Sequence, residues 1–251
     1  RAIDEALLAY PQLDDLQSGV VLDVKPKEMQ VMISTGDTIT ITNVANTISD
    51  AALVGGGGIP QPGEISLAHN GVLFLDELPE FKRSVLEVMR QPLEERKVTI
   101  SRSRWSVDYP ASFMLVASMN PCPCGYHNHP SKACTCAPGA VNRYLSKISG
   151  PLLDRIDIHI EVSPVSHDEL AFRKKDGETS ADIRARVIEA RKIQEVRYKD
   201  EAGIFNNAML PSNRVHEYCE IPAAGQVLLK AAMQKLNLSA RAYDKILKLS
   251  R

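Results

Sequence analysis

This sequence of 251 residues lacks long apolar runs, a cysteine framework and an excess of one charge. Its apolar runs stay well short of the roughly 20 residues that a membrane-spanning helix needs, and Arg1-Ala-Ile-Asp-Glu5 is no secretory signal. Thirty Lys and Arg stand against 31 Asp and Glu, so no overall basic field indicates nucleic acid. Five cysteines are too few for a disulfide scaffold. These absences predict a soluble, cytoplasmic protein with no membrane partner.

The first 44 residues are acidic and rich in β-branched side chains. Three short stretches have the composition of strands, namely Gly19–Val24, Gln30–Ser34 and Thr38–Thr42. They predict a small antiparallel meander, which faintly resembles the OB-like insert of bifunctional penicillin-binding proteins. The favoured interpretation of residues 1–44 is a β-rich segment of unclear origin.

From about residue 45 the pattern changes to alternating strands and helices. Gly71–Leu75 and Phe113–Ser118 are continuous apolar runs, as expected of strands buried on both faces of a parallel sheet. The region between and after them predicts a helix over Ser84–Arg90 that Pro92 ends, a hairpin around Arg102–Arg104, and a third strand over Asp157–Val162. We therefore expect an α/β core over residues 45–165.

The remaining residues, 166–251, predict a helical lid. Ser180 can cap a helix with an apolar stripe made of Ile183, Val187, Ala190 and Ile193. Two more helices are expected over residues 222–235 and 239–251. The sequence stops inside the last helical pattern without a Gly or Pro stop signal, so we expect a chain truncated at its C-terminus.

Polar side chains follow both buried strands. Asp76 and Glu77 come directly after the first strand, and Asn120 follows the second. Nucleotides bind at the carboxyl ends of strands in open α/β folds. There Asp76 can hold Mg²⁺, and Glu77 can orient and deprotonate an attacking water. The alternative is an acidic helix cap, since Asp and Glu favour helix starts.

Three long segments resemble a known family: Thr47–Gly58, Pro62–Phe81 and Ser118–Gly125. With them, the stretch from about Thr47 to Arg251 resembles the AAA+ ATPase module of magnesium-chelatase-like proteins, the ComM/YifB group linked to competence and DNA processing. The resemblance implies a parallel sheet of the AAA+ type with helices and a β-hairpin insert, followed by the helical lid. It also implies ATP and Mg²⁺ as cofactors, a homo-oligomeric ring, and single-stranded or branched DNA as a partner.

The resemblance also implies roles for single residues. Asp76 and Glu77 become the Walker B pair, with Asp76 at the magnesium ion, and Asn120 becomes sensor 1. Arg155 becomes the arginine finger offered to the neighbouring subunit, and Arg241 the sensor 2 residue of the lid. An ion pair of Arg155 with Asp154 or Asp157 is the alternative for that residue.

One element of the family is missing: the sequence contains no Gly-Lys pair and so no P-loop. Gly55–Gly58 is no substitute, because no Lys-Ser/Thr follows it. Whether this chain is an enzyme by itself therefore stays open. The first hypothesis is a partial ATPase module that couples ATP hydrolysis in a ring to DNA processing, as a helicase in branch migration or transformation. The alternatives are an inactive partner- or zinc-binding module and a magnesium chelatase ATPase subunit.

Four of the five cysteines fall within one short stretch, and only Cys219 lies apart. Thiolates on tight turns can fill the four tetrahedral positions of a structural Zn²⁺. His127 and His129 lie inside the same loop. The alternative is a loop of free thiols. The expected zinc ligands are Cys122, Cys124, Cys134 and Cys136.

Basic side chains are concentrated locally around the predicted hairpin. Arg102, Arg104 and Trp105 at its tip combine cations with an aromatic ring, which can contact phosphates and stack on a base. The alternative is a solvated hairpin with Trp105 packed underneath.

Overall fold

The computed structural model describes residues 20–24, 28–32, 38–102, 105–162 and 178–251. The chain forms two compact units, Arg1–Ser180 and Ala181–Arg251, and each is described by itself. The domain limits that the sequence suggests at residues 44 and 165 remain predictions.

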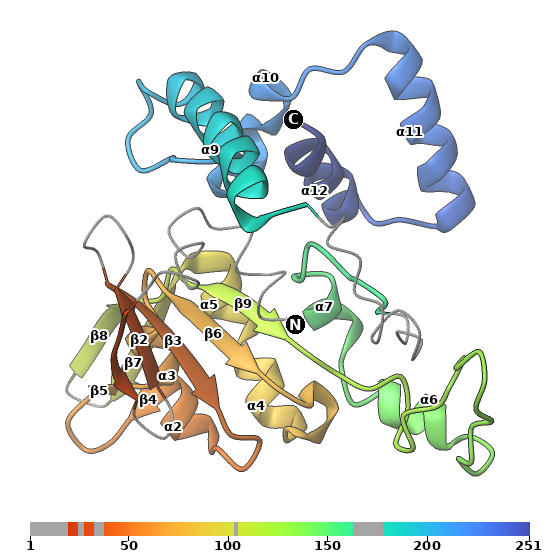
Figure 1. The fold of residues 1–251 in the computed structure, drawn as a ribbon. Coiled ribbons are helices and arrows are strands. Elements are labelled where there is room, and N and C mark those ends of the chain that lie inside the picture. Colours follow the sequence, from red (N-terminus) through yellow and green to blue (C-terminus); the bar gives the residue numbers. More distant parts are fainter. Residues whose placement is uncertain (1–19, 25–27, 33–37, 103–104, 163–177) are drawn as a thin grey trace. The chain divides into compact units, whose positions relative to one another are not determined.

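The first unit is built on a five-stranded sheet of order β1-β2-β3-β6-β9 (Figure 1). β1 to β3 form the predicted antiparallel meander, whereas β3, β6 and β9 run parallel to one another. The meander is thus continuous with the α/β sheet through β3. The strands are β1 (Val20–Val24), β2 (Glu28–Met32), β3 (Thr38–Val44), β6 (Val72–Leu75) and β9 (Met114–Ala117).

β6 is the central strand of the parallel part, and all four of its residues are buried. Its continuous apolar run matches this position, because helices or loops cover both faces of a parallel strand. Gly71, just before the strand, lies so close to the carbonyl oxygen of Thr40 that a Cβ would clash with it. A glycine therefore permits the close approach of β3 and β6.

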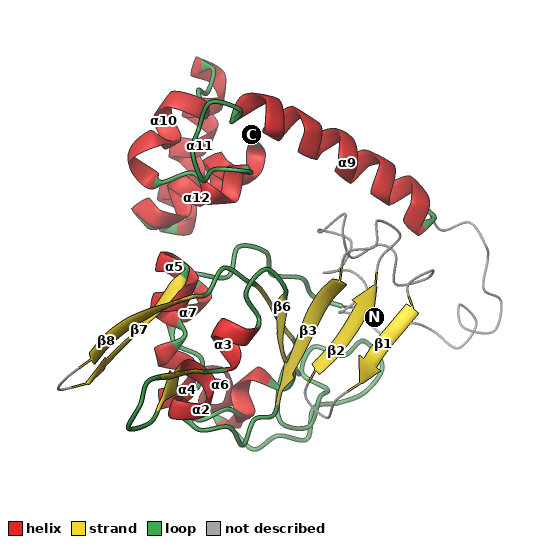
Figure 2. Cartoon of the chain, turned by 90° about the vertical axis from the view of Figure 1, so that its left-hand side faces the viewer, coloured by secondary structure: helices red, strands yellow, loops and turns green. Residues whose placement is uncertain are grey.

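Short helices on one side of the sheet supply the core of this unit (Figure 2). Leu53, Ile65 and Leu86 from three of these helices are buried with Leu73 and Leu75 of β6. The predicted α/β fold is thereby confirmed. The helices and the short 3-10 helix η2 have these bounds: α2 (Asp50–Val54), α3 (Glu64–Leu67), η2 (Leu78–Glu80), α4 (Arg83–Val88), α5 (Arg90–Glu95), α6 (Ala140–Leu145) and α7 (Gly150–Leu153).

Two hairpins lie side by side at one end of the unit. The predicted hairpin consists of β7 (Lys97–Arg102) and β8 (Trp105–Pro110), and it extends away from the sheet (Figure 2). The smaller one joins β4 (Gly55–Gly56) to β5 (Gln61–Pro62). Tyr109 donates a hydrogen bond to the carbonyl of Pro60 (2.8 Å), and Arg102 donates to that of Gly57 (3.3 Å). The glycine-rich segment is therefore fixed against the larger hairpin.

Two predictions for this unit are wrong. Pro92 does not end a helix but lies in the first turn of α5, where a proline costs no helical hydrogen bond. Residues 156–162 form no strand, and the apolar side chains of Ile158, Ile160 and Val162 are exposed. The alternating pattern of this segment suits a strand, but no described strand pairs with it.

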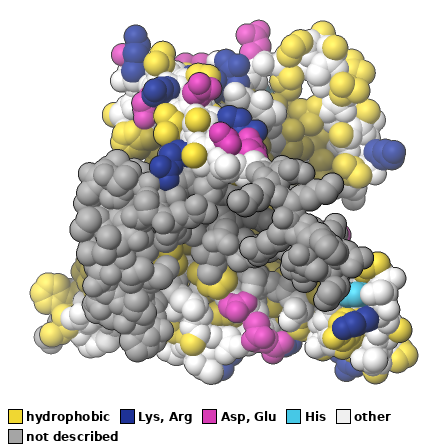
Figure 3. Space-filling model, viewed as in Figure 1, with side chains coloured by type: hydrophobic (Ala, Val, Ile, Leu, Met, Phe, Trp, Pro, Cys, Tyr) yellow, Lys and Arg dark blue, Asp and Glu magenta, His cyan; other side chains and the backbone are white. Residues whose placement is uncertain are grey.

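The second unit is helical, as predicted. Its α-helices are α9 (Ser180–Arg197), α10 (Val215–Tyr218), α11 (Ala223–Leu236) and α12 (Ala240–Ser250). Two short 3-10 helices, η3 (Asn207–Met209) and η4 (Ser212–Arg214), lie between α9 and α10. Its small core gathers Tyr198, Leu210, Val215, Cys219 and Leu247. The stripe predicted on α9 is wrong at Ala190 and Ile193, which are both exposed. Ile193 lies near the end of α9 that the core residue Tyr198 follows, but its side chain is not buried in that core. Val227 and Leu228 of α11 are also exposed, and Figure 3 shows hydrophobic side chains over this helix.

An ion-pair network fixes the turn between α9 and α10. Arg214 donates to both carboxylate oxygens of Glu201 (2.6 and 2.8 Å), and the Tyr218 hydroxyl also donates to that carboxylate. The guanidinium of Arg214 lowers the pKa of Glu201. Among the described residues, no helix is long and apolar enough to cross a membrane.

Candidate functional site

The carboxyl ends of β6 and β9 bring Asp76 and Ser118 together. Leu75 and Ala117 are partners in the parallel register, so the next residue of each strand lies at the same edge of the sheet. The Ser118 hydroxyl and the backbone N–H of Glu77 both donate hydrogen bonds to Oδ1 of Asp76. The carboxylate is therefore held in place while the side chain stays exposed, so its oxygens are accessible to a Mg²⁺ ion.

Glu77 turns the chain at this edge. Its backbone is left-handed, with φ 53° and ψ 49°, which is unusual for a residue other than glycine. The following N–H, that of Leu78, donates to the carbonyl of Ser118 (2.9 Å), so the chain crosses the end of β9. The Glu77 side chain is exposed beside Asp76, where it can reach a water.

Asn120 lies at the same edge, two residues beyond Ser118, with its side chain exposed. Tyr144, a residue of the nearby helix α6, is buried. Burial and the nearby Glu80 carboxylate raise the pKa of that phenol. The sequence predicted that Asp76, Glu77 and Asn120 lie at this edge. It gave no role to Ser118, although this residue begins the family-like segment Ser118–Gly125, because its contact with Asp76 joins residues that are distant in the chain.

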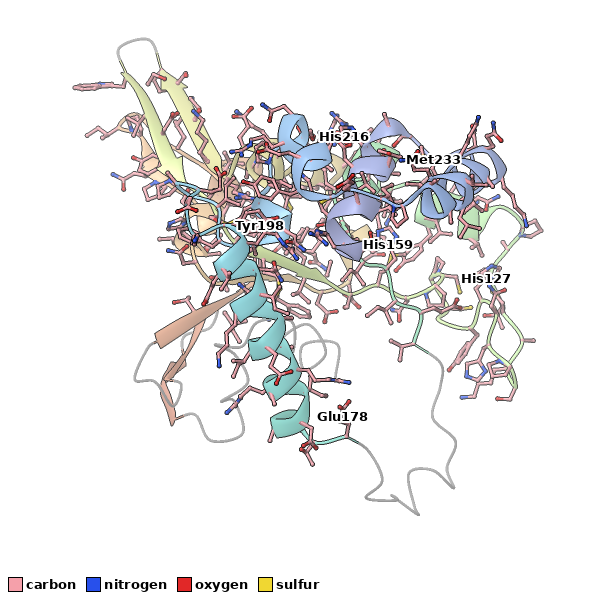
Figure 4. The ribbon with its side chains drawn as sticks, turned by 90° about the horizontal axis from the view of Figure 1, so that it is seen from above. His127, His159, Glu178, Tyr198, His216 and Met233 are labelled. Atoms are coloured by element: carbon pink, nitrogen blue, oxygen red, sulfur yellow. The ribbon has the colours of Figure 1, made fainter. Side chains whose placement is uncertain are left out.

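The four clustered cysteines converge in the loop between β9 and α6, which also carries His127 (Figure 4). Their sulfur atoms all lie within 4.8 Å of one another, and the closest pairs are 3.3, 3.5 and 3.8 Å apart. Four thiolates around one Zn²⁺ at about 2.3 Å have sulfurs about 3.8 Å apart. The arrangement therefore fits a tetrahedral metal site, and all five cysteines of the chain are free thiols.

The pKa values of these thiols diverge within the cluster. A backbone hydrogen bond from Tyr126 lowers the pKa of Cys124 to about 5. A backbone hydrogen bond lowers that of Cys136 as well, but burial and the neighbouring thiols outweigh it and raise the value to about 12. Four thiolates so close together repel one another, so a bound cation is needed before all four can ionise.

Arg155, which follows α7, is held within its own unit. Its side chain is only 8% exposed and forms an ion pair with Glu94 of α5 (2.6 Å). It also donates to the backbone carbonyls of Arg90 (3.2 Å) and Pro151 (2.5 Å). The ion-pair partner expected from the sequence was Asp154 or Asp157, and Glu94 was missed because it is distant in the chain.

The hairpin tip presents an exposed aromatic ring. The Trp105 side chain is 61% exposed, so it does not pack beneath the hairpin. Arg102 is anchored to Gly57, and Lys97 pairs with Asp108 (2.8 Å) farther down the hairpin. Arg104 lies outside the described residues. Ile59, at the tip of the smaller hairpin, is exposed as well.

Arg241 lies on α12 of the second unit. The structure describes this unit by itself, so a contact of Arg241 with the nucleotide edge stays a prediction.

Comparison with known proteins identifies the family. Residues 24–170 match the family model of the magnesium chelatase subunit ChlI, and residues 177–251 match the model of its C-terminal region. The chain therefore belongs to the magnesium chelatase ChlI family, and its parallel sheet with flanking helices is of the AAA+ type. Within this family it is a magnesium-chelatase-like protein of the ComM/YifB kind, as its relatives show.

The chain is 48% identical over 210 residues to the competence protein ComM of Haemophilus influenzae. It is 42% identical over 206 residues to the YifB protein of Escherichia coli K12. Both alignments cover 82% of this chain but 39% of the relative, so the chain spans about two-fifths of the length of these relatives. The ChlI subunit of Mesostigma viride is 26% identical over 148 residues, which is 53% of this chain and 35% of that protein.

Proposed function

We propose that this chain is part of an AAA+ ATPase that works as an oligomeric ring on DNA. The observation that carries the proposal is the shared edge of β6 and β9, where Asp76 is fixed by Ser118 and lies beside Glu77. Asp76 would hold Mg²⁺, Glu77 would orient and deprotonate the attacking water, and Asn120 would sense the γ-phosphate. When bound, Mg²⁺ would neutralise charge on the phosphates.

Two arginines would complete the ATPase site. We propose Arg155 as the finger offered to a neighbouring subunit and Arg241 as the lid residue that contacts nucleotide. A guanidinium suits both places, because the transferring phosphoryl group needs a permanently charged, planar partner. A magnesium chelatase activity is the weaker alternative, since identity to ComM exceeds identity to ChlI. An inactive binding module is the other alternative.

This chain alone is expected to bind ATP weakly and to hydrolyse it negligibly, because it lacks the backbone amides and the lysine of a P-loop. Hydrolysis should appear when a relative's P-loop segment precedes the chain, and it should disappear again with Glu77→Gln. A coupled phosphate-release assay on the two proteins measures this. If the chain alone hydrolyses ATP robustly and Glu77→Gln abolishes this activity, another segment must bind the phosphates. Persistent inactivity of the fusion despite nucleotide binding would favour the inactive module.

We further propose that the β7–β8 hairpin contacts single-stranded DNA through Trp105. The exposed indole offers a face on which a base can stack, and Arg102 and Arg104 supply positive charge near the tip. DNA is favoured over another partner because ComM is a competence protein by name.

Single-stranded DNA is expected to quench the fluorescence of Trp105, which is the single tryptophan of the chain. Trp105→Ala should weaken DNA binding about tenfold or more, because stacking of one base on an aromatic side chain is worth ~1–3 kcal/mol. Affinity should also fall steeply with salt, since phosphate contacts release counterions. Fluorescence anisotropy of a labelled oligonucleotide measures both effects.

Phe205→Ala, which removes an exposed aromatic from the second unit, is the control and should leave binding unchanged. If Trp105→Ala and the parent bind DNA with equal affinity, the hairpin does not contact DNA.

We propose, in addition, that Cys122, Cys124, Cys134 and Cys136 bind one structural Zn²⁺. The convergence of their four sulfur atoms supports this assignment. Four sulfur ligands leave no open position for a substrate, so the ion would stabilise the loop rather than take part in chemistry.

A further inference from the structure

The two oxygens of the Asp76 carboxylate have different surroundings. Oδ1 accepts hydrogen bonds from the Ser118 hydroxyl and from the backbone N–H of Glu77 (2.9 Å). Each carboxylate oxygen has two lone-pair sites, so these two donors occupy Oδ1 fully. Oδ2 accepts no hydrogen bond from the part of the chain that the structure describes, and the side chain is exposed. One oxygen is therefore bound within the protein, and the other is available to a ligand.

The backbone of Ser118 is fixed on both sides of the Asp76-Glu77 pair. Its N–H donates to the carbonyl of Leu75 (3.0 Å), and its carbonyl accepts from the N–H of Leu78 (2.9 Å). These bonds continue the parallel pairing of β6 with β9, which lie side by side (Figure 1). Because the backbone cannot shift, only rotation of the short side chain can move the hydroxyl away from Oδ1. Ser118 is thus well placed to keep that oxygen occupied.

The number of available carboxylate oxygens affects which cation binds well. Ca²⁺ takes about six to eight oxygen ligands in flexible geometry and often binds both oxygens of one carboxylate. Mg²⁺ requires octahedral geometry, retains several waters, and is usually held by one or two carboxylates. A carboxylate with one available oxygen therefore suits Mg²⁺, whereas a carboxylate with both oxygens available also suits Ca²⁺.

We propose that Ser118 determines the cation preference of this edge. By occupying Oδ1 it restricts Asp76 to binding through Oδ2, which favours Mg²⁺ over Ca²⁺. This inference rests on the proposed role of Asp76 as the magnesium ligand. Ser118 acts through Asp76 and is therefore a positioning residue. Without its hydroxyl, Oδ1 keeps only the bond from the Glu77 N–H, and both oxygens can turn toward one cation.

A metal titration of the present chain without nucleotide tests this inference. Mg²⁺ and Ca²⁺ are added separately, and the amide NMR signals of residues 76–78 report binding at this edge. Ser118→Ala should raise the affinity for Ca²⁺ relative to Mg²⁺ about tenfold, the low end of what one hydrogen bond to a charged group contributes. Ser118→Thr keeps a hydroxyl and should keep the parent's ratio. Ser106→Ala, which removes a hydroxyl from β8 of the same unit, is the control and should also keep it.

Three results of this titration would contradict the inference. An unchanged ratio in Ser118→Ala, with binding still at residues 76–78, would overturn the role of Ser118 and leave Asp76 as a metal ligand. An equal rise in Ser118→Ala and Ser118→Thr would show that the hydroxyl does not set the preference. If neither cation shifts these amide signals, the metal site itself fails and the inference fails with it.

Cation inhibition of ATP hydrolysis separates this inference from the proposed function. In a fusion that carries a P-loop, Ca²⁺ should inhibit Mg²⁺-dependent turnover of Ser118→Ala at about tenfold lower concentration than in the parent, by the same lost hydrogen bond. A changed affinity ratio in the chain together with an inactive fusion would retain the role of Ser118 and remove the ATPase. An active fusion in which Ca²⁺ inhibits the parent and Ser118→Ala equally would overturn the role of Ser118 alone.

Discussion

Arg155→Ala is expected to lower ATP turnover by a factor on the order of 10³ in an assembly to which a P-loop has been supplied. This factor is at the low end of the range for arginine fingers. Nucleotide binding should remain nearly intact, because a finger acts on a neighbour's nucleotide. Steady-state hydrolysis and nucleotide titration of the same preparation measure the two effects. In the structure Arg155 is paired with Glu94 of its own unit, so the finger role requires this contact to open.

Mixing mutant subunits separates a finger in trans from an internal ion pair. Arg155→Ala subunits retain Glu77, and Glu77→Gln subunits retain Arg155. An Arg155 side chain from one kind of subunit can therefore complete the site of the other kind, which has an intact Glu77. Mixed rings should therefore regain part of the activity. A mixture as inactive as either mutant, in rings that demonstrably exchange subunits, would leave the internal ion pair as the better account.

Glu94→Gln is the matched control for this experiment. It removes the charge that faces Arg155 but leaves the guanidinium in place. If Arg155 acts as a finger, turnover should largely survive the substitution. If the pair serves only to fix α5 against the segment after α7, Glu94→Gln should cause a loss like that of Arg155→Ala.

The cysteine cluster is expected to hold about one equivalent of zinc in protein purified under reducing, chelator-free conditions. Joint replacement of Cys134 and Cys136 by serine should abolish this content, because structural zinc sites bind with apparent free energies of about 10–16 kcal/mol that depend on all four ligands. Elemental analysis by mass spectrometry measures it. Cys219→Ala, which removes the remaining cysteine from the second unit, should keep the full equivalent.

Loss of zinc should loosen the loop without unfolding the first unit. The main core is formed by residues of the sheet and its helices, and it includes no residue of the loop over 122–136. Protease cleavage within this loop should therefore accelerate while the main thermal transition persists. Absence of metal from protein prepared in this way would contradict the assignment, and the four thiols would then be free.

Local patterns predicted the elements that lie in the sheet and much of the candidate site. The apolar runs around Leu73 and Val116 indicated buried parallel strands, and the polar residues after them indicated a shared edge, because parallel strands end on the same side. The segment over 157–162 shows the limit of this reasoning. Its alternation suits a strand, but a strand forms only where a neighbour supplies hydrogen-bond partners, and the sequence pattern does not state which neighbours are present.

Contacts between distant residues could not be predicted in the same way. Glu94 lies in α5 and Arg155 follows α7, so their pairing depends on how these two helices pack. Tyr144 carried no signal either, since a lone tyrosine in a short helix belongs to no motif. Its burial is a property of the folded chain.

The left-handed backbone of Glu77 implies a conflict between stability and activity at one residue. A side chain with a Cβ is less stable in this conformation than glycine, by roughly 1–2 kcal/mol. Selection for folding alone would therefore favour glycine at position 77, and with it the loss of the candidate base. In the proposed function, a glutamate at this position therefore lowers the stability of the fold while it supplies the candidate base.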